Sequence, residues 1–262
     1  MNILDTIIAK KRVEVEERKR SKPVAELKNG PFFKNEVLDF KKYLSRDDKT
    51  GIIAEFKKRS PSKGIINNSS SVVEVTTAYA KYGASGISIL TDEEFFGGSL
   101  NDLLEGTVNV VPLLRKDFII DEYQLVESKA FGAEVILLIA ACLSTNEVKS
   151  LAAFAKNLGL NVLLEIHNED ELEHICDDVD VVGVNNRDLK TFSVDINRSI
   201  ELGKNIPGDK IKISESGIDD AATIKLLQQH GFKGFLMGEK FMKENDPGEA
   251  FKNFVEELNQ LQ

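Results

Sequence analysis

Short apolar segments rich in β-branched residues recur along this chain and constrain its fold more than any other feature. Their starts are separated by about 20 to 35 residues, a spacing typical of units in which a strand is followed by a helix. This rhythm predicts an α/β fold built on a parallel sheet. The segments comprise residues 51–56, 86–90, 110–114, 133–139, 161–166, 179–184, 210–214 and 234–237.

Helix start and stop signals lie between these segments. Ser, Thr, Asp or Asn followed three residues later by Glu or Gln has the spacing of a capping box. Glycine favours the left-handed backbone that ends a helix. The expected starts are Ser71 with Glu74, Asp121 with Gln124, Ser144 with Glu147, Asn168 with Glu171, and Asp246 before Pro247, and the expected stops are Gly83, Gly132, Gly159 and Gly231.

Eight strands that alternate with helices over 262 residues predict a (β/α)8 TIM barrel. An open, doubly wound sheet is the alternative, and the even spacing of the units disfavours it. We expect residues 1–262 to form a single barrel domain, with residues 1–45 as an N-terminal helical extension. The charges of mixed sign in residues 10–22 suit a solvent-exposed face, whereas Ile3, Leu4, Ile7 and Ile8 recur at helical spacing.

Composition narrows the classes of partner. A formal net charge of −9 argues against nucleic acid, whose phosphates attract basic surfaces. No apolar run reaches the ~18 residues of a membrane span, so we expect no membrane partner. Cys142 and Cys176 form no CxxC pair and are interpreted as buried, reduced thiols, which indicates the cytoplasm. We expect a monomer that binds a small molecule.

The first predicted strand ends in a carboxylate and a lysine two residues apart, in the stretch IIAEFKKRSPSKG. Side chains alternate along a strand, so Glu55 and Lys57 are expected on one face at its end. A basic, turn-prone loop follows, which includes Ser60. The pair is either one side of a functional site or an ordinary ion pair at a strand exit.

Polar side chains also follow other predicted strands. In a barrel, the carboxyl ends of all strands meet at one mouth, where catalytic groups gather. Unpaired buried charge is costly, so such groups should be hydrated, paired or in use. Each alone could be a surface charge, but together they predict an active site: Glu55, Lys57, Lys116, Glu165, Asn185 and Glu215.

Two glycines suggest an anion site. Gly217 follows the seventh predicted strand and Gly238 the eighth, and each is expected to open onto a helix start. The loops after these strands form the usual phosphate site of a barrel, so we expect an anionic phosphate ligand. The alternative is that the glycines only form tight turns.

Histidines and phenylalanines give weaker signals. His167, His174 and His230 show no metal-ligand spacing and are interpreted as structural or surface residues. Phe95, Phe96 and Phe118 lie just beyond the second and third predicted strands, where they would pack on an aromatic substrate or cap the barrel.

Six motifs carry a family resemblance. In order they are AEFKKRSPSKG, LLRKDFI, LLEIH, VGVNNRDL, ISESGI and FLMGE. Together they closely resemble indole-3-glycerol phosphate synthase of tryptophan biosynthesis over nearly the whole chain. The resemblance implies an enzyme that needs neither cofactor nor metal. Its substrate would be 1-(2-carboxyphenylamino)-1-deoxyribulose 5-phosphate, which cyclises with loss of carbon dioxide and water.

The resemblance also implies catalytic roles. Lys116 matches the general acid, for which we expect a lowered pKa. Lys57 matches the lysine that contacts the substrate carboxylate and is a second candidate proton donor to the leaving hydroxyl. Glu165 matches the group that takes the anilinium proton and stabilises positive charge. Glu55 matches a carboxylate that assists dehydration and holds the lysines, and Asn185 and Glu215 match groups that position the sugar hydroxyls.

Binding roles follow from the same resemblance. The phosphate would contact Ser60, Gly217 and Gly238, with the backbone of Ser216 and Glu239. Some relatives carry Ser where this chain has Glu239, so its carboxylate is expected to point away from the phosphate. The anthranilate ring would pack against Phe118, Leu137 and Leu189, and Arg187 is a further candidate for substrate binding.

Two alternatives remain. One is a sister phosphate-binding barrel such as phosphoribosylanthranilate isomerase, which would not require the pair formed by Glu55 and Lys57. The other is a non-catalytic sensor of a phosphate metabolite, in which some catalytic groups should be missing.

Overall fold

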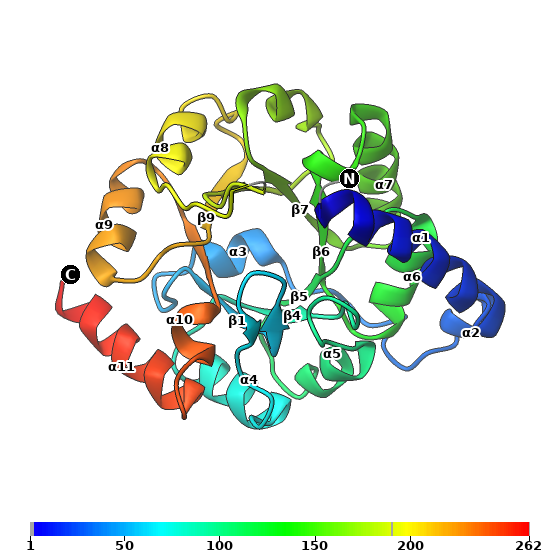
Figure 1. Ribbon diagram of the computed structural model, residues 1–262, viewed down its shortest axis with the longest axis horizontal. Helices are drawn as coiled ribbons and strands as arrows, with labels where there is room; N and C mark the ends of the chain where they lie inside the picture. Colours follow the sequence, from blue (N-terminus) through cyan, green and yellow to red (C-terminus); the bar gives the residue numbers. More distant parts are fainter. Residues whose placement is uncertain (1–2, 190, 262) are drawn as a thin grey trace.

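Eight parallel strands close into a barrel in the computed structural model, which describes residues 3–189 and 191–261 (Figure 1). The closed order β1-β10-β9-β8-β7-β6-β5-β4 confirms the (β/α)8 prediction and excludes an open doubly wound sheet. The strands are β1 (Ile52–Phe56), β4 (Gly86–Leu90), β5 (Leu113–Lys116), β6 (Val135–Ile139), β7 (Asn161–Ile166), β8 (Val181–Asn185), β9 (Ile211–Glu215) and β10 (Gly234–Met237).

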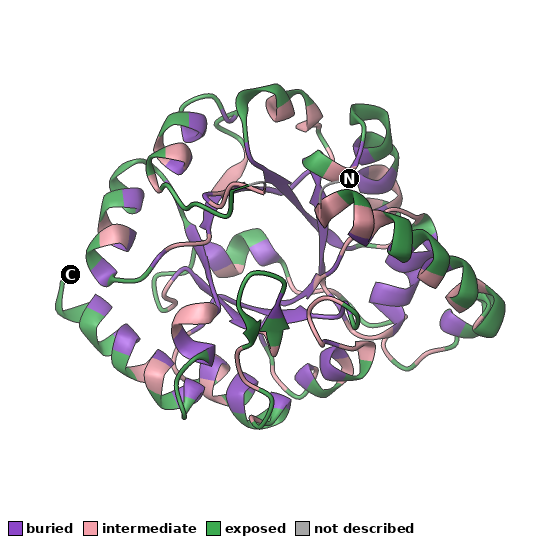
Figure 2. Cartoon of the chain, in the orientation of Figure 1, coloured by how far each residue is buried: buried purple, intermediate pink, exposed green. Residues whose placement is uncertain are grey.

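Helical segments follow the strands and cover the outside of the barrel. Their buried faces point toward the sheet and their exposed faces toward solvent (Figure 2). These segments are α4 (Val72–Lys81), α5 (Leu100–Gly106), α6 (Glu122–Ala130), η1 (Ala140–Cys142), α7 (Thr145–Asn157), η2 (Glu169–His174), α8 (Asn197–Gly203), α9 (Ala221–Gln229), α10 (Glu239–Met242) and α11 (Pro247–Gln260).

Most expected helix boundaries are confirmed. Ser144 and Glu147 form a reciprocal capping box, and Ser71, Asp121 and Asp246 accept backbone N–H groups at the starts of their helices. The stop glycines adopt the left-handed backbone that other residues disfavour. Their φ angles are 95° at Gly83, 86° at Gly132, 77° at Gly159 and 81° at Gly231.

The expected helix start at Asn168 is confirmed, and this residue caps a segment of 3-10 helix, η2. Two local predictions are wrong. The third strand begins at Leu113 and not at residue 110, because Val110 is 78% exposed before the chain enters the barrel. Gly217 does not open directly onto a helix, since α9 begins only at Ala221.

The core has an inner and an outer layer. The inner layer consists of side chains that point into the barrel, such as Ile53, Leu163 and Ile213. The outer layer packs the opposite faces of the strands against the surrounding helices. Helix α3 (Phe40–Leu44) contributes Phe40 and Leu44 to the inner layer and closes the end where the strands begin.

The N-terminal extension contains α1 (Ile3–Ser21), α2 (Val24–Leu27) and α3. Helix α1 lies at the opposite end of the barrel and runs outward over α6, and Ile3, Leu4 and Ile7 near its start border the central cavity (Figure 1). The expected solvent-exposed face of residues 10–22 is wrong in part. Lys11 is 1% and Val15 is 3% exposed, because α1 packs against the barrel along this stretch.

Three further features concern the loop after β1, the two cysteines and the search for membrane-spanning helices. The loop after β1 forms a small hairpin from β2 (Arg59–Ser60) and β3 (Gly64–Ile65). Cys142 and Cys176 carry free thiols and are half-buried rather than fully buried as expected. In the part of the chain that the structure describes, no helix is both long and apolar enough to cross a membrane.

Candidate active site

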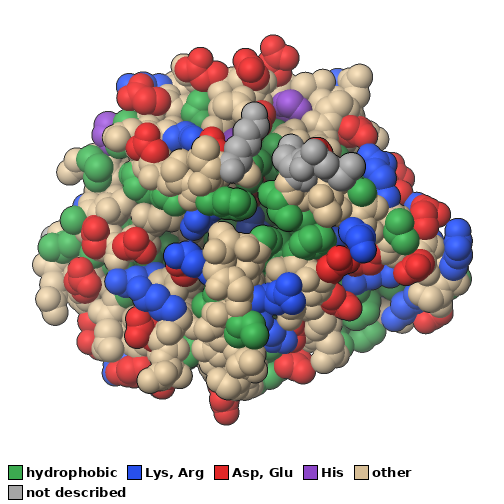
Figure 3. Space-filling view, viewed as in Figure 1, with side chains coloured by type: hydrophobic (Ala, Val, Ile, Leu, Met, Phe, Trp, Pro, Cys, Tyr) green, Lys and Arg blue, Asp and Glu red, His purple; other side chains and the backbone are tan. Residues whose placement is uncertain are grey.

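A cavity of about 720 Å³ opens at the carboxyl ends of the strands. The space-filling view shows a central hollow bordered by hydrophobic and cationic side chains (Figure 3). The cavity lining includes all the residues that the sequence predicted for the site: Glu55, Lys57, Ser60, Lys116, Phe118, Leu137, Glu165, Asn185, Arg187, Leu189, Glu215, Ser216, Gly217, Gly238 and Glu239.

Strand periodicity explains why these side chains meet. Ile53, Leu114, Leu163 and Ile213 point into the barrel, so the residues two positions later point the same way at the mouth. Those residues are Glu55, Lys116, Glu165 and Glu215. Below them the inward positions are apolar and above them is the cavity, so ionisable groups begin where the barrel interior ends.

Lys116 and two carboxylates form the centre of the site. The ammonium Nζ of Lys116 lies 2.7 Å from Oε2 of Glu165 and 3.4 Å from Oε2 of Glu215. The amide of Asn185 donates to Oε1 of Glu165 at 3.1 Å. One cation thus faces two carboxylates that are less than 5% exposed, an arrangement that keeps buried charge compensated.

The electrostatics of this cluster overturn one prediction. Burial lowers the pKa of Lys116, but the carboxylates of Glu165, Glu215 and Glu55 outweigh burial and raise its pKa above the ordinary value. The expected lowered pKa of Lys116 is therefore wrong, because the sequence could not show how many carboxylates would face the ammonium. Lys116 is held in its charged, protonated form.

The two carboxylates beside Lys116 differ in acidity. Burial raises the pKa of Glu165, but Lys116 and His167 outweigh it and hold the pKa well below its ordinary value. Burial also raises the pKa of Glu215, and the nearby charge of Glu165 raises it further against the opposing effect of Lys116. Two carboxylates that share one cation lose their protons at different pH, and such a pair can supply an ionised group and a protonated group at one pH.

Glu55 and Lys57 form the ion pair expected at the end of β1. Nζ of Lys57 lies 2.6 Å from Oε1 of Glu55, and both side chains face the cavity. Gly238 makes room for this pair, since a Cβ there would lie 2.6 Å from Oε1 of Glu55. The φ of Gly238 is −133°, so this glycine is needed for space rather than for a left-handed backbone.

Loops that follow β1, β8, β9 and β10 form another side of the cavity. Ser216 and Gly217 both have positive φ, and the Asn186 amide donates to the Ser216 carbonyl at 3.0 Å, which holds this turn in place. The Glu239 carboxylate lies 3.4 Å from Nζ of Lys63 and 3.7 Å from Nη2 of Arg187. Two cations thus border this side of the cavity.

An apolar wall completes the cavity. The rings of Phe96 and Phe118 pack with centroids 6.1 Å apart, and Leu137 and Leu189 also line the space. Helix α1 adds Ile3, Leu4 and Ile7 to this wall. Sequence reasoning placed these three residues on a helix but gave no signal that the helix would reach the mouth.

Gly183 is a second residue that sequence reasoning missed. A Cβ at this position would overlap Oε1 of Glu215. Among the described residues this oxygen is buried and has no hydrogen-bond partner. The glycine in the VGVNN motif therefore provides the space that the Glu215 side chain occupies.

His167 lies beside the cluster and is 8% exposed. Its Nε2 is 3.3 Å from Oε1 of Glu165, and its Nδ1 is 3.4 Å from Oε2 of Glu171. Among the described residues neither ring nitrogen has a partner in hydrogen-bond geometry, so the attraction is mainly ionic. Burial lowers the pKa of His167, but the two carboxylates outweigh it and raise the pKa to about 9.

His167→Asn should change how stability depends on pH. Because the folded-state pKa of about 9 exceeds the ordinary 6.5, the charged histidine stabilises the protein fully below about pH 6.5, and this contribution is lost as pH rises through 9. The variant should therefore lose up to about 3 kcal/mol more at pH 6 than at pH 10 in urea unfolding. Exposed His230→Asn is the control, and an equal loss at both pH values for His167→Asn would contradict the prediction.

The next question is whether side chains of the described residues could bind a metal ion at the mouth of the barrel. In residues 3–189 and 191–261, no group of three or more His, Cys, Asp or Glu side chains is arranged to hold a metal ion. The cavity offers three kinds of group. They are the Lys116 ammonium among carboxylates, the ion pair of Lys57 with Glu55, and the backbone and cationic side chains of the loops.

The chain is similar to known proteins over nearly its whole length. The family model described as indole-3-glycerol phosphate synthase matches residues 4–254. A protein of that name from Bacteroides thetaiotaomicron is 48% identical over 98% of this chain and 99% of its own length. Another, from Thermoanaerobacter pseudethanolicus, is 44% identical over 97% of this chain and 98% of its own.

Solved structures support the fold. A mutant tryptophan synthase α-subunit from Pyrococcus furiosus superposes with a TM-score of 0.61 at 17% identity, covering 81% of this chain and 99% of that one. The 3-hexulose-6-phosphate synthase of Salmonella typhimurium gives the same TM-score at 13% identity, covering 80% and 99%. At this level of identity the likeness concerns the barrel fold alone.

Proposed function

Because this chain belongs to the indole-3-glycerol phosphate synthase family, we propose that the side chains at the mouth of its barrel carry out the family's decarboxylating ring closure. The chain is a carboxy-lyase of tryptophan biosynthesis. The observation that carries the proposed roles is the placement of Lys116 between Glu165 and Glu215, with an apolar wall beside them and cations on the loops of the cavity.

The substrate is 1-(2-carboxyphenylamino)-1-deoxyribulose 5-phosphate, and the reaction needs an acid near its ketone. The ring carbon that carries the carboxylate bonds to the ketone carbon, carbon dioxide leaves, and water is then lost. Lys116 donates its proton to the ketone oxygen as that oxygen gains negative charge. A raised pKa suits this step, because the lysine stays protonated until attack makes the oxygen a stronger base than an amine.

Glu165 stabilises the positive charge that develops on the anilinic nitrogen. Its lowered pKa keeps it ionised, and an anion in a partly dry cavity stabilises a nearby cation more strongly than it would in water. The electron pair released when carbon dioxide leaves cancels this charge, so Glu165 accepts a proton only when loss of the hydroxyl makes the ring nitrogen positive again. Asn185 and Glu215 flank it and position the sugar hydroxyls.

Lys57 binds the carboxylate of the substrate and Glu55 orients Lys57. Their separation of 2.6 Å holds the lysine in one rotamer at the mouth, although it lies at the base of a loop. When carbon dioxide has left, Lys57 no longer contacts a substrate carboxylate and is placed to protonate the leaving hydroxyl. Glu55 assists that dehydration by holding Lys57, and the single proton that the ring then loses goes to Glu165.

The phosphate binds at the loops that follow β1, β9 and β10. Ser60, the turn at Ser216 and Gly217, and the backbone at Gly238 and Glu239 supply donors there. Lys63 and Arg187 draw the Glu239 carboxylate toward themselves, which supports the expectation that it does not face the phosphate. The anthranilate ring packs between Phe118, Leu137 and Leu189.

Purified protein given the substrate is expected to release carbon dioxide and to generate indole fluorescence. The chain has no tryptophan, so the product signal rises above a weak tyrosine background. A phosphoribosylanthranilate isomerase would instead convert phosphoribosylanthranilate, and a sensor would bind ligand without turnover. Absence of both carbon dioxide and indole would contradict the proposed function.

We also propose a cellular compartment, an oligomeric state and a class of partner. The half-buried free thiols of Cys142 and Cys176 suit a reducing compartment, and we place the protein in the cytoplasm. The monomer stays a prediction that light scattering would test. The acidic net charge of −9 supports a small-molecule partner rather than nucleic acid.

A further inference from the structure

Helix α1 buries a lysine against the barrel close to the proposed general acid. Lys11 is 1% exposed, and its Nζ lies 2.9 Å from Oδ2 of Asp92, 2.9 Å from Oδ1 of Asp117 and 2.8 Å from Oε2 of Glu14. Asp92 and Asp117 follow β4 and β5, so this cation joins α1 to two neighbouring strand ends. None of the catalytic roles proposed above uses Lys11.

Asp117 occupies the turn between two proposed site residues. It follows Lys116 directly, and its Oδ1 accepts the backbone N–H of Phe118 at 2.8 Å. The same Oδ1 faces Lys11, whereas Oδ2 accepts from Thr91 at 2.7 Å and from Arg115 at 2.9 Å. This carboxylate therefore fixes the backbone from which Lys116 and Phe118 enter the cavity.

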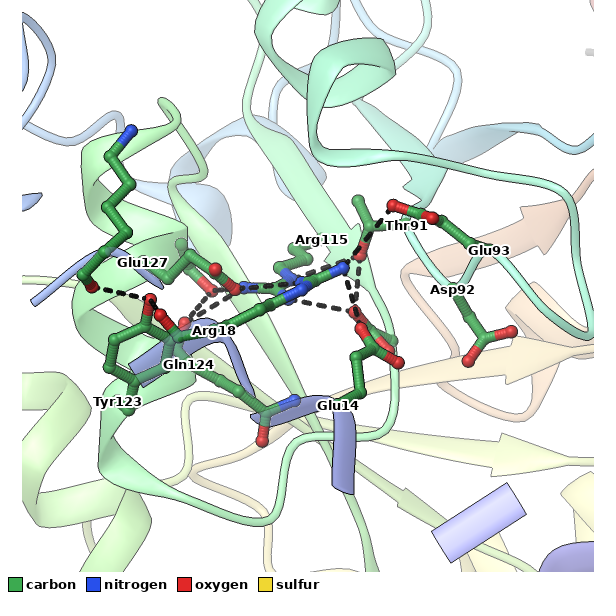
Figure 4. Close-up of polar contacts among 12 residues, drawn as sticks. Glu14, Arg18, Thr91, Asp92, Glu93, Arg115, Tyr123, Gln124 and Glu127 are labelled. Carbon is green, nitrogen blue, oxygen red and sulfur yellow. Dashed lines mark hydrogen bonds and ion pairs between the residues drawn. The ribbon is translucent and has the colours of Figure 1, made fainter. Parts of the chain in front are cut away.

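A second group of charges anchors the same region further along α1. Arg18 and the fully buried Arg115 approach Glu127 at 3.2 and 2.9 Å (Figure 4). Arg18 also pairs with Glu14 at 2.7 Å, and Glu14 in turn contacts Lys11. Helix α1 thus has a peripheral anchor at Arg18 and an inner contact at Lys11, and only the inner contact reaches the carboxylate that holds the turn.

The positive charge of Lys11 compensates the buried carboxylates of Asp92 and Asp117. Asp92 is 1% and Asp117 is 2% exposed, and a buried carboxylate without a cation is strongly destabilised. Arg115 pairs with Asp117 through the other carboxylate oxygen, so removal of Lys11 would leave Oδ1 with the Phe118 N–H alone. Thr91 and Arg115 would still hold Oδ2, but Oδ1, which holds the Phe118 N–H, would lose its cation and could admit water, so the turn would shift.

We propose that Lys11 is a positioning residue, which acts through Asp117 to set the turn that carries Lys116 and Phe118. This inference rests on the proposed function. It makes the docking of the N-terminal helix a step in assembling the active site, because the same helix also contributes Ile3, Leu4 and Ile7 to the apolar wall. The competing view is that Lys11 only adds stability to the fold.

The test compares Lys11→Met with two variants of the same helix. Met keeps the length and apolar stem of the side chain but removes the charge. Val15→Ala weakens the packing of α1 against α2 and α6 without touching Asp117, and Lys19→Met breaks the partly exposed pair with Asp121. For each full-length variant, product fluorescence counts binding sites and gives the dissociation constant, and turnover is expressed per binding site.

Loss of correct positioning should lower turnover per site in Lys11→Met about 10- to 100-fold, the range for a misplacement of the order of 1 Å. It should also weaken product binding, because Phe118 moves with Lys116. Val15→Ala and Lys19→Met should stay within about twofold of the wild type per site. The double variant Lys11→Met/Asp117→Asn should lose little more than Asp117→Asn alone, since the lysine acts through that carboxylate.

The results separate positioning from stability. A purely structural lysine would reduce the number of competent sites and leave turnover per site unchanged, which would overturn the inference, as would an equal loss per site in Val15→Ala. If Lys11→Met does not fold, Lys11→Gln, which is shorter and removes the charge but keeps a polar end, replaces it with the same criterion. Inactive wild-type protein would instead overturn the proposed function.

Discussion

Lys116→Ala is expected to lower turnover by roughly 10²–10⁴-fold, the usual contribution of one acid–base group. The ammonium sits 2.7 Å from Glu165, and no other cation is within ion-pair distance of that carboxylate in the described part of the chain, apart from His167. Without Lys116, the ketone oxygen would gain negative charge with no proton donor beside it. Steady-state kinetics by indole fluorescence measures the loss.

A matched control tests whether any buried lysine would give this result. Lys129 is 8% exposed and donates to the Asn35 carbonyl at 3.1 Å, away from the mouth. Lys129→Ala should reduce stability but keep turnover within a few-fold of the wild type. Near-full activity in Lys116→Ala would remove Lys116 from the role of general acid and leave Lys57 as the other candidate proton donor.

The same substitution should also change the pH dependence. Lys116 lowers the pKa of Glu165 and of Glu215, so its removal raises both. The acidic limb of the pH–rate profile, where an ionised Glu165 is needed, should therefore move to higher pH in Lys116→Ala. A profile that keeps its acidic limb in place would mean that Glu165 is not the group that titrates there.

Glu165→Gln is the second change with a large expected effect, a loss of roughly 10²–10⁴ in turnover. Glutamine keeps the size of the side chain and an oxygen that can accept from Asn185, as Glu165 does at 3.1 Å. It loses the negative charge that stabilises the anilinium and the capacity to accept its proton. The loss should appear mainly in kcat, because that charge develops only as the reaction proceeds.

Glu134→Gln is the matched control for this carboxylate. Glu134 is half-buried just before β6, where it accepts backbone N–H groups from Leu38 and Leu113 at 3.2 and 3.0 Å. Its replacement should affect stability and leave kcat nearly unchanged. If Glu165→Gln raised KM alone and kept kcat, Glu165 would bind substrate without taking part in proton transfer.

The order of strands and helices could be read from local signals. Apolar segments, capping residues and stop glycines act over a few residues, so their positions in sequence predict their positions in structure, as at Ser144 and Gly83. Where the local signal was ambiguous the prediction was wrong. Residue 110 resembles a strand start but is exposed, because the register of β5 against β4 begins only at Leu113.

Side chains on the inner face of strands could likewise be anticipated. Once eight strands close into a barrel, period-two alternation alone directs Glu55, Glu165 and Glu215 toward one mouth. Family motifs added their proposed roles. Contacts between distant segments could not be predicted in this way, because they depend on packing that no local pattern encodes. Examples are Gly183 beside Glu215, His167 beside Glu165, and Lys11 beside Asp117.

The sequence by itself determined the barrel, the residues at the strand ends and the chemistry that those residue types permit. Only the tertiary structure decided the protonation of Lys116 and the position of the N-terminal helix. Both depend on the sum of charges and surfaces brought together from separate parts of the chain: three carboxylates that outweigh the burial of Lys116, and three that surround Lys11. Electrostatic energy depends on distances in space, and these are fixed only when the barrel closes.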